Sequence, residues 1–245
     1  MNTPYSPPPA NDPNPPASDN NEGSVARALA GDYDFDIWEV IQTAWESTDG
    51  YKMPIAIIGA VYFVIYLVAM GLTAGLFGSE VTGIIAQQLV GLLFAPMNAA
   101  FFMIGLRMAN REEINTAMLF AHYDKLLPLV GLQLVGTVAV LIGFMLLVLP
   151  GIYLAYAVLF ASPLMVEKGM GIVEAFETSR KAVTHHWFKF FGLWLVMGLI
   201  MFISMLPLGI GLFWTTPMML LLLGQLYLRL FGLGTASSNH TSLVG

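Results

Sequence analysis

Long apolar runs alternate with short polar segments along most of the chain, and the runs fall into three pairs. About 20 consecutive apolar residues are needed to cross the hydrocarbon core of a bilayer as a helix. The pattern therefore predicts an all-α, polytopic integral membrane protein with six transmembrane helices arranged as three hairpins. The predicted spans are 53–77 with 81–106, 126–149 with 152–166, and 190–206 with 213–228.

An amphipathic segment precedes each hairpin, at 36–46, 112–122 and 172–187. The first begins with Asp36 and has Glu39 three residues later, as in a helix capping box. We expect three short helices that lie flat at the membrane interface. Their expected apolar faces are Ile37, Trp38, Ile41, Ala44 and Trp45; Ile114, Ala117, Met118 and Ala121; and Val173, Phe176, Ser179 and Val183.

These units suggest a threefold internal repeat over 36–107, 110–168 and 171–230. Ile37, Glu39 and Thr43 of the first unit correspond to Ile172, Glu174 and Thr178 of the third. Repeats of two spans keep one orientation, so a pseudo-symmetry axis would run along the membrane normal. Convergent use of helix caps and boundary lysines would produce the same pattern, and this alternative stays open.

Prolines and small residues indicate how the spans are shaped and packed. The second span of each pair contains a proline, Pro96, Pro163 or Pro217, which removes a helix hydrogen bond and favours a kink. Gly71 and Gly75 form a GxxxG pair in the first span, which allows close helix approach. Intramolecular packing and dimerisation would both use such a stripe.

Composition supports the membrane class and predicts a polar tail at each end of the membrane domain. The 245 residues are 57% hydrophobic and 11% charged, whereas globular domains carry about 25% charged residues. Residues 1–31 are rich in Pro, Asn, Asp and Ser, which predicts a disordered cytoplasmic tail before the membrane domain at 32–234. Residues 235–245 form a second, short cytoplasmic tail.

All ten Lys and Arg residues fall outside the three turns within the hairpins. This is the positive-inside pattern, and it predicts that both termini are cytoplasmic. The net charge of -6 gives no basic surface, so nucleic-acid binding is not expected.

Polar residues inside the spans are neutral, and no Asp or Glu falls within a span. This argues against a transporter driven through an intramembrane carboxylate. Asn98, Gln133 and Gln225, together with Arg229 at the inner end of the sixth span, are candidates for a polar cavity that opens inward. Interhelical hydrogen bonding is the simpler interpretation of the three amides.

Four cations beside the third amphipathic segment are candidates for contact with anionic lipid head groups: Lys168, Arg180, Lys181 and Lys189. The expected partner is the lipid bilayer, and a homo-oligomer is compatible with the sequence. No metal-binding, phosphate-binding or nucleophile motif is present. We therefore predict no catalytic residue, no cofactor and no metal.

The central part of the chain resembles a known family. Leu149-Pro150-Gly151-Ile152-Tyr153-Leu154, Ser162-Pro163-Leu164-Met165-Val166 and the run from Gly171 to Ser179 are similar to the signature of YciC-like bacterial inner-membrane proteins. Similar runs occur in the membrane domain of some glycerophosphodiester phosphodiesterases. The resemblance implies a six-span protein of the bacterial inner membrane and supplies no catalytic residue, because the phosphodiesterase domain is missing.

Taken together, these features predict a non-enzymatic membrane scaffold or lipid-interacting accessory protein. The alternative is a transporter or channel for a small solute that uses the neutral polar cavity. An intramembrane enzyme is the third and weakest interpretation.

Overall fold

The computed structural model describes residues 23–78 and 80–233, and every regular element in this part of the chain is a helix. The all-α prediction is confirmed. The elements are α1 (Val25–Ala30), α2 (Ile37–Glu46), α3 (Lys52–Phe77), α4 (Val81–Leu93), α5 (Ala95–Ala109), η1 (Thr116–Phe120), η2 (Tyr123–Lys125), α6 (Leu126–Leu146), α7 (Val148–Ala157), α8 (Ala161–Glu167), α9 (Ile172–His185), α10 (Trp187–Met205) and α11 (Leu212–Phe231).

Within the described residues, five helical segments are long and apolar enough to cross a membrane. They are Lys52–Phe77, Val81–Ala109, Thr116–Leu146, Val148–Glu167 and Trp187–Met205. The sixth predicted span is helical as α11 but does not belong to this set. Thr215, Thr216, Pro217, Gln225 and Arg229 make it more polar than the other five. The structure therefore supports a membrane protein, and the sixth crossing stays a prediction.

The prolines act differently in the three second spans. The helix is interrupted at Phe94, just before Pro96, and again over 158–160, just before Pro163. Pro217 instead lies inside the continuous helix α11. Two of the three spans are thus broken.

Phe160, in the second of these breaks, is fully buried at the centre of an aromatic cluster. Its ring packs against Phe102 of α5, Phe190 of α10 and Phe231 of α11, with centroid distances of 5.7–5.9 Å. Every hairpin therefore contributes to one core. We call the elements around it the base: α1, α2, α5, α8, α9 and the adjoining ends of α10 and α11.

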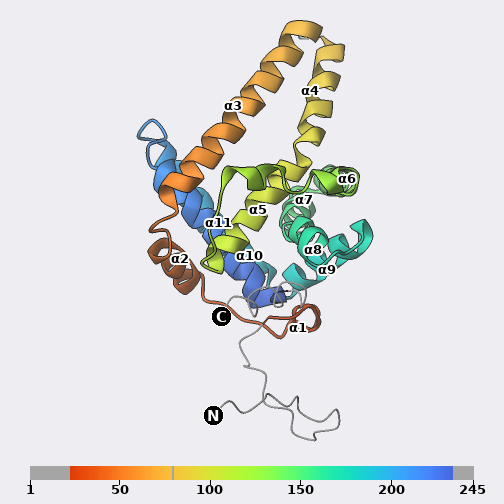
Figure 1. Cartoon of the computed structure of the whole chain (residues 1–245). Helices are drawn as coiled ribbons and strands as arrows, with labels where there is room; N and C mark the ends of the chain where they lie inside the picture. The colour runs from red at the N-terminus through yellow and green to blue at the C-terminus, as the bar shows by residue number, and fades with distance from the viewer. Residues whose placement is uncertain (1–22, 79, 234–245) are drawn as a thin grey trace, which may run out of the picture.

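Three apolar arms extend from the base: residues 60–93, 134–156 and 195–216. Figure 1 shows the α3–α4 arm projecting well away from the rest of the molecule. The large side chains near the turns are exposed, with Leu76 at 76%, Met145 at 86% and Leu208 at 97%. The arms contain a single charged residue, Glu80, so their surface suits hydrocarbon rather than water.

Two of the three predicted amphipathic helices are present. Asp36 accepts a hydrogen bond from the Glu39 backbone N–H at 2.9 Å, so the predicted Asp36 cap is confirmed, while the Glu39 side chain bonds Arg229. The first helix, α2, buries Val40, Ile41 and Ala44 but leaves Trp38 and Trp45 exposed. The third helix, α9, buries Ser179 and Val183, two of the four residues expected on its apolar face. Its buried side chains are Ala175, Thr178, Ser179, Ala182 and Val183, whereas Val173 points outward.

The predicted amphipathic helix at 112–122 is wrong. Arg111 adopts the left-handed conformation, with φ of 60°, and the Glu112 N–H donates to the Arg107 carbonyl at 2.9 Å. This pairing closes the C-terminus of α5, so the polar run ends the preceding helix instead of starting a new one. The chain then makes only the two short 3₁₀ turns η1 and η2, and Leu119 is the residue they bury.

The predicted disordered tail at 1–31 overlaps a helix at its end. Residues 1–22 and the tail at 235–245 lie outside the described residues. Ser24 caps α1, and Gly31 ends it with φ of 72°. Ala28 of α1 is fully buried, so this segment belongs to the base.

Two glycines allow a close contact between α5 and α11 in the base. A Cβ on Gly224 would lie 2.2 Å from the carbonyl oxygen of Gly105, and a Cβ on Gly105 would lie 2.2 Å from the Leu220 oxygen. By contrast, a Cβ on Gly71 or Gly75 would meet nothing within 4 Å. The GxxxG pair of the first span thus makes no close contact within the described chain.

Candidate functional site

The four residues predicted to share one polar cavity lie in two separate cavities. Asn98 and Gln133 line a cavity of about 580 Å³ between α5, α6, α7 and α8. Gln225 and Arg229 line another, of about 910 Å³, between α2, α5 and α11. We call the first the lateral groove and the second the base pocket.

The lateral groove is mostly apolar with a few uncharged polar side chains. Asn98, Gln133, Thr137 and Ser162 supply the polar groups. The Oδ1 atom of Asn98 accepts a hydrogen bond from the Tyr62 hydroxyl at 3.1 Å. Both helix breaks border the groove, since Ala95 follows one and Val158 lies in the other.

The base pocket is a polar cleft beside the end of α2. Glu46, Asp49, Arg111 and Arg229 line it together with Gln225. Arg229 donates to Glu39 at 2.7 Å and so ties α11 to α2. The Gln225 Oε1 atom is buried and accepts no hydrogen bond from any described residue.

Each of the four cations predicted to contact lipid head groups is paired with an acid. Lys168 lies 3.4 Å from Glu167 and donates to the Gly232 carbonyl at 2.8 Å. Lys189 bonds the carboxylate of Asp34 in the segment before α2. This hydrogen bond, made by the Lys189 ammonium, lowers the pKa of the Asp34 carboxyl.

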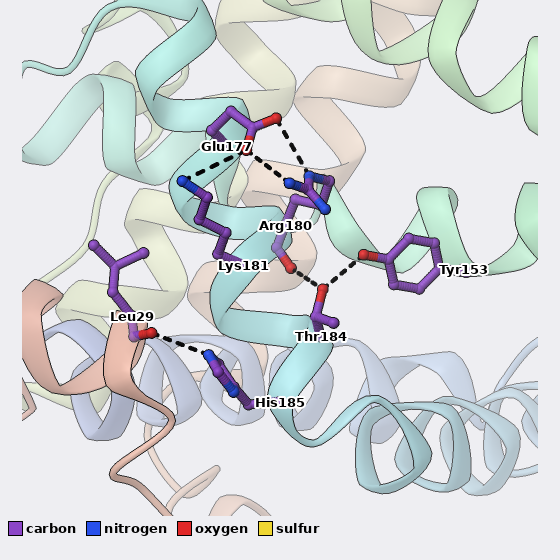
Figure 2. Close-up of polar contacts among 7 residues, drawn as sticks. All are labelled: Leu29, Tyr153, Glu177, Arg180, Lys181, Thr184 and His185. Atoms are coloured by element: carbon purple, nitrogen blue, oxygen red, sulfur yellow. Dashed lines mark hydrogen bonds and ion pairs between the residues drawn. The ribbon is translucent and has the colours of Figure 1, made fainter.

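Arg180 and Lys181 share one acid on α9, as Figure 2 shows. The Arg180 guanidinium donates to Glu177 at 2.8 and 3.3 Å, and the Lys181 ammonium lies 3.9 Å from the same carboxylate. The Arg180 hydrogen bonds are the main reason that the pKa of Glu177 is lowered. These pairs partly neutralise the cations, which remain on the exposed side of α9.

The C-terminal end of α9 is fixed to two other parts of the chain. The Thr184 hydroxyl donates to the Arg180 carbonyl at 2.6 Å and lies 2.6 Å from the Tyr153 hydroxyl of α7. His185 Nε2 lies 3.0 Å from the Leu29 carbonyl of α1 (Figure 2). The charged helix α9 is therefore a structural part of the base and does not lie loose on its surface.

Ser179 of α9 stabilises the break between α7 and α8. Its buried hydroxyl donates to the Ala157 carbonyl at 2.6 Å and accepts from the Phe160 N–H at 3.1 Å. Both backbone groups are left without helix partners by the interruption. Sequence reasoning placed Ser179 on an apolar face and missed this role, because nothing local identifies the partner backbone.

Sequence reasoning also missed Thr137 and Ser162 as lining residues of the lateral groove. Thr137 follows Gln133 by four residues, so both lie on one face of α6. That spacing was a usable signal. Ser162 is brought opposite them only by the tertiary fold.

Comparison with models of known protein families, with curated proteins and with solved structures finds no match to this chain.

Proposed function

We propose that this protein is a non-enzymatic, lipid-interacting accessory or scaffold protein of the bacterial inner membrane. The supporting observation is the separation of charge between the two regions. All ten Lys and Arg residues lie outside the arms, at the base or at the helix ends that adjoin it. This arrangement favours a cytoplasmic base, cytoplasmic termini and six crossings. Membership of the YciC-like family belongs to the same proposal.

Exposed apolar side chains on the base support contact with the membrane interface. Trp38 of α2, Val173 of α9 and Phe188 of α10 are 68%, 72% and 73% exposed. Aromatic side chains beside cations are typical of the boundary between head groups and hydrocarbon. The base would therefore rest against the inner surface through these residues while the arms enter the bilayer.

Site-directed labelling tests this proposal directly, because the chain contains no cysteine. Single cysteines carrying spin labels at 38, 173 and 188 should report lipid exposure in reconstituted protein. A label at Lys181, on the charged side of α9, is the control and should report water. Water exposure at all four positions would contradict the interfacial base.

The topology has a separate test. Reporter fusions after Gly78, Gly151 and Leu208 should give a signal from outside the cytoplasm, because all three lie on the apolar arms, which contain no Lys or Arg. A further reporter after Gly232, beyond α11, should give a cytoplasmic signal; a signal from outside the cytoplasm at this position would contradict the sixth crossing while leaving the membrane class intact.

A transporter or channel for a small neutral solute is the second candidate function. The lateral groove favours it, since Asn98 and Gln133 meet there. Gln225 and Arg229 open into a different cavity, so the four predicted residues do not line one pathway. Flux of a neutral solute such as glycerol into proteoliposomes would support this candidate.

A further inference from the structure

We propose that the lateral groove binds one membrane lipid, holding an acyl chain along its apolar wall and an uncharged ester or hydroxyl group at its polar side chains. The inference deepens the proposed function, on which it rests, by naming a site and the chemistry of its ligand.

The lining of the groove selects for an uncharged ligand group. None of the side chains that line it is ionisable. A phosphate or ammonium group inside the groove would find no counter-charge, and an isolated charge in such a site is costly. The amide and hydroxyl groups of the groove can instead form hydrogen bonds with the uncharged carbonyl or hydroxyl oxygens of a ligand.

Of the four polar side chains that line the groove, only Asn98 has a hydrogen-bond partner within the described chain, the Tyr62 hydroxyl. Among the described residues, Gln133, Thr137 and Ser162 have no hydrogen-bond partner. By contrast, two hydroxyls on the other arms are satisfied within their own helix, since Thr73 donates to the Ala69 carbonyl at 3.1 Å and Ser204 to the Ile200 carbonyl at 2.7 Å. The polar groups of Gln133, Thr137 and Ser162 are therefore available to a ligand in the groove.

Unpaired polar groups are expensive where water is scarce, because each loses its hydrogen bonds to water without a replacement. Gln133 and Thr137 lie on α6 within a helix of membrane length. Ser162 approaches from α8 and Asn98 from α5. A lipid carbonyl or hydroxyl at this point would satisfy several of these groups together.

The apolar wall continues onto the arm surface, which identifies the source of the ligand. Leu141 and Phe144 line the groove and are also 56% and 46% exposed. The groove is therefore continuous with the surface that faces acyl chains in a bilayer. A membrane lipid reaches it sideways, without crossing an aqueous path.

The two helix breaks make room for this site. Ala95 and Val158, at or beside the breaks, are both in its wall. Interrupted helices in membrane proteins are commonly found where backbone lines a binding cavity. The prolines thus contribute to a site, in addition to shaping the packing.

Gly136 allows the groove to be filled without disturbing the fold. It lines the groove, and a Cβ placed on it would meet nothing within 4 Å. A Gly136→Leu side chain would occupy the position of the acyl chain. Gly198→Leu is the matched control, because Gly198 of α10 also has open space and lies on another arm.

The experiment is native mass spectrometry of the full-length protein in detergent, titrated with dioleoylglycerol or with phosphatidylglycerol. The unmodified chain should retain one dioleoylglycerol molecule, and Gly136→Leu should weaken this binding at least tenfold. Gly198→Leu should bind as the unmodified chain does. Phosphatidylglycerol should place its acyl chain and ester region in the same groove and leave its phosphate outside. Its binding should therefore also be lost in Gly136→Leu.

A second variant tests the polar contacts. Thr137→Val keeps the shape of the side chain but removes the hydroxyl, and should weaken dioleoylglycerol binding threefold to tenfold. Equal retention of lipid by Gly136→Leu and the unmodified chain would overturn the proposal, as would glycerol flux without any retained lipid. Extraction with carbonate serves as the control. If Gly136→Leu stays in the membrane fraction, a loss of lipid binding reflects the filled groove and not a defect in membrane insertion.

Discussion

The base and the arms are made of the same kind of apolar residue but are stabilised in different ways. In the base, Phe160 is enclosed by aromatic rings from several helices, and ion pairs such as Arg229–Glu39 join elements distant in sequence. In the arms, large side chains such as Leu208 are almost fully exposed. Protein atoms complete the packing of the base, whereas lipid must complete that of the arms. Apolar character alone therefore does not identify a protein core in this chain.

Glycines show the same contrast at atomic scale. Gly105 and Gly224 let two backbones meet in the base, and no side chain fits between them. Gly71 and Gly75 in the first arm have open space around them. A GxxxG motif is thus a weak indicator here, while the essential close approach uses two glycines with no shared motif.

The largest expected effect comes from placing side chains at these glycines. Gly224→Val would force a Cβ against the Gly105 carbonyl and should destabilise the protein by about 3 kcal/mol or more. Gly75→Val, in the first arm, should leave stability nearly unchanged. Unfolding by sodium dodecyl sulfate, followed by tryptophan fluorescence, measures both. Equal loss in the two variants would abolish the distinction between base and arms.

Removal of the Ser179 hydroxyl should have the next largest effect. Ser179→Ala leaves the buried Phe160 N–H and Ala157 carbonyl unpaired, at a cost of about 1–3 kcal/mol. Ser204→Ala is the control, because the Ser204 hydroxyl only bonds its own helix. The same unfolding assay compares them. A neutral Ser179→Ala would show that the break between α7 and α8 needs no support from α9.

The ion pair between α2 and α11 should contribute less. Arg229 and Glu39 are 34% and 59% exposed at the side chain, and such pairs are worth about 0.2–1 kcal/mol. A double-mutant cycle with Glu39→Gln and Arg229→Gln should give a coupling energy in this range that falls with added salt. A coupling energy of zero at low salt would mean that α2 is held by its buried face alone.

Acidification should produce the smallest effect and should act only at the base. The pKa of Asp34 is lowered by Lys189, so their interaction stabilises the fold above the ordinary carboxyl value of about 3.9 and is lost as the pH falls through the lower folded-state pKa. Asp34→Asn should lower the unfolding midpoint slightly at pH 6, and this effect should shrink as the pH falls below the ordinary carboxyl pKa. A difference between the two proteins that does not shrink on acidification would contradict this assignment.

Features with a local physical cause were predictable from sequence. Apolar runs marked the long helices, and the spacing of Asp36 and Glu39 marked the start of α2. The prediction of a helix at 112–122 was wrong because the Glu112 N–H bonds the Arg107 carbonyl and so ends α5. The local sequence pattern does not reveal this hydrogen bond. Sequence identified Asn98 and Gln133 as a potential pair but joined them wrongly with Gln225. Which polar residues share a cavity depends on contacts between helices far apart in the chain.

The ion pair between α2 and α11 also sets an order of events during synthesis. Glu39 and Arg229 are separated by 190 residues, so Glu39 leaves the ribosome long before its partner exists. At roughly 5–20 residues per second, the wait is about 10–40 s. All three hairpins are translated in that interval, and Phe231 is among the last residues to arrive. The base is therefore the final part of the molecule to form, and a chain cut short before α11 would present inserted arms with an open, aromatic-lined surface to cellular quality control.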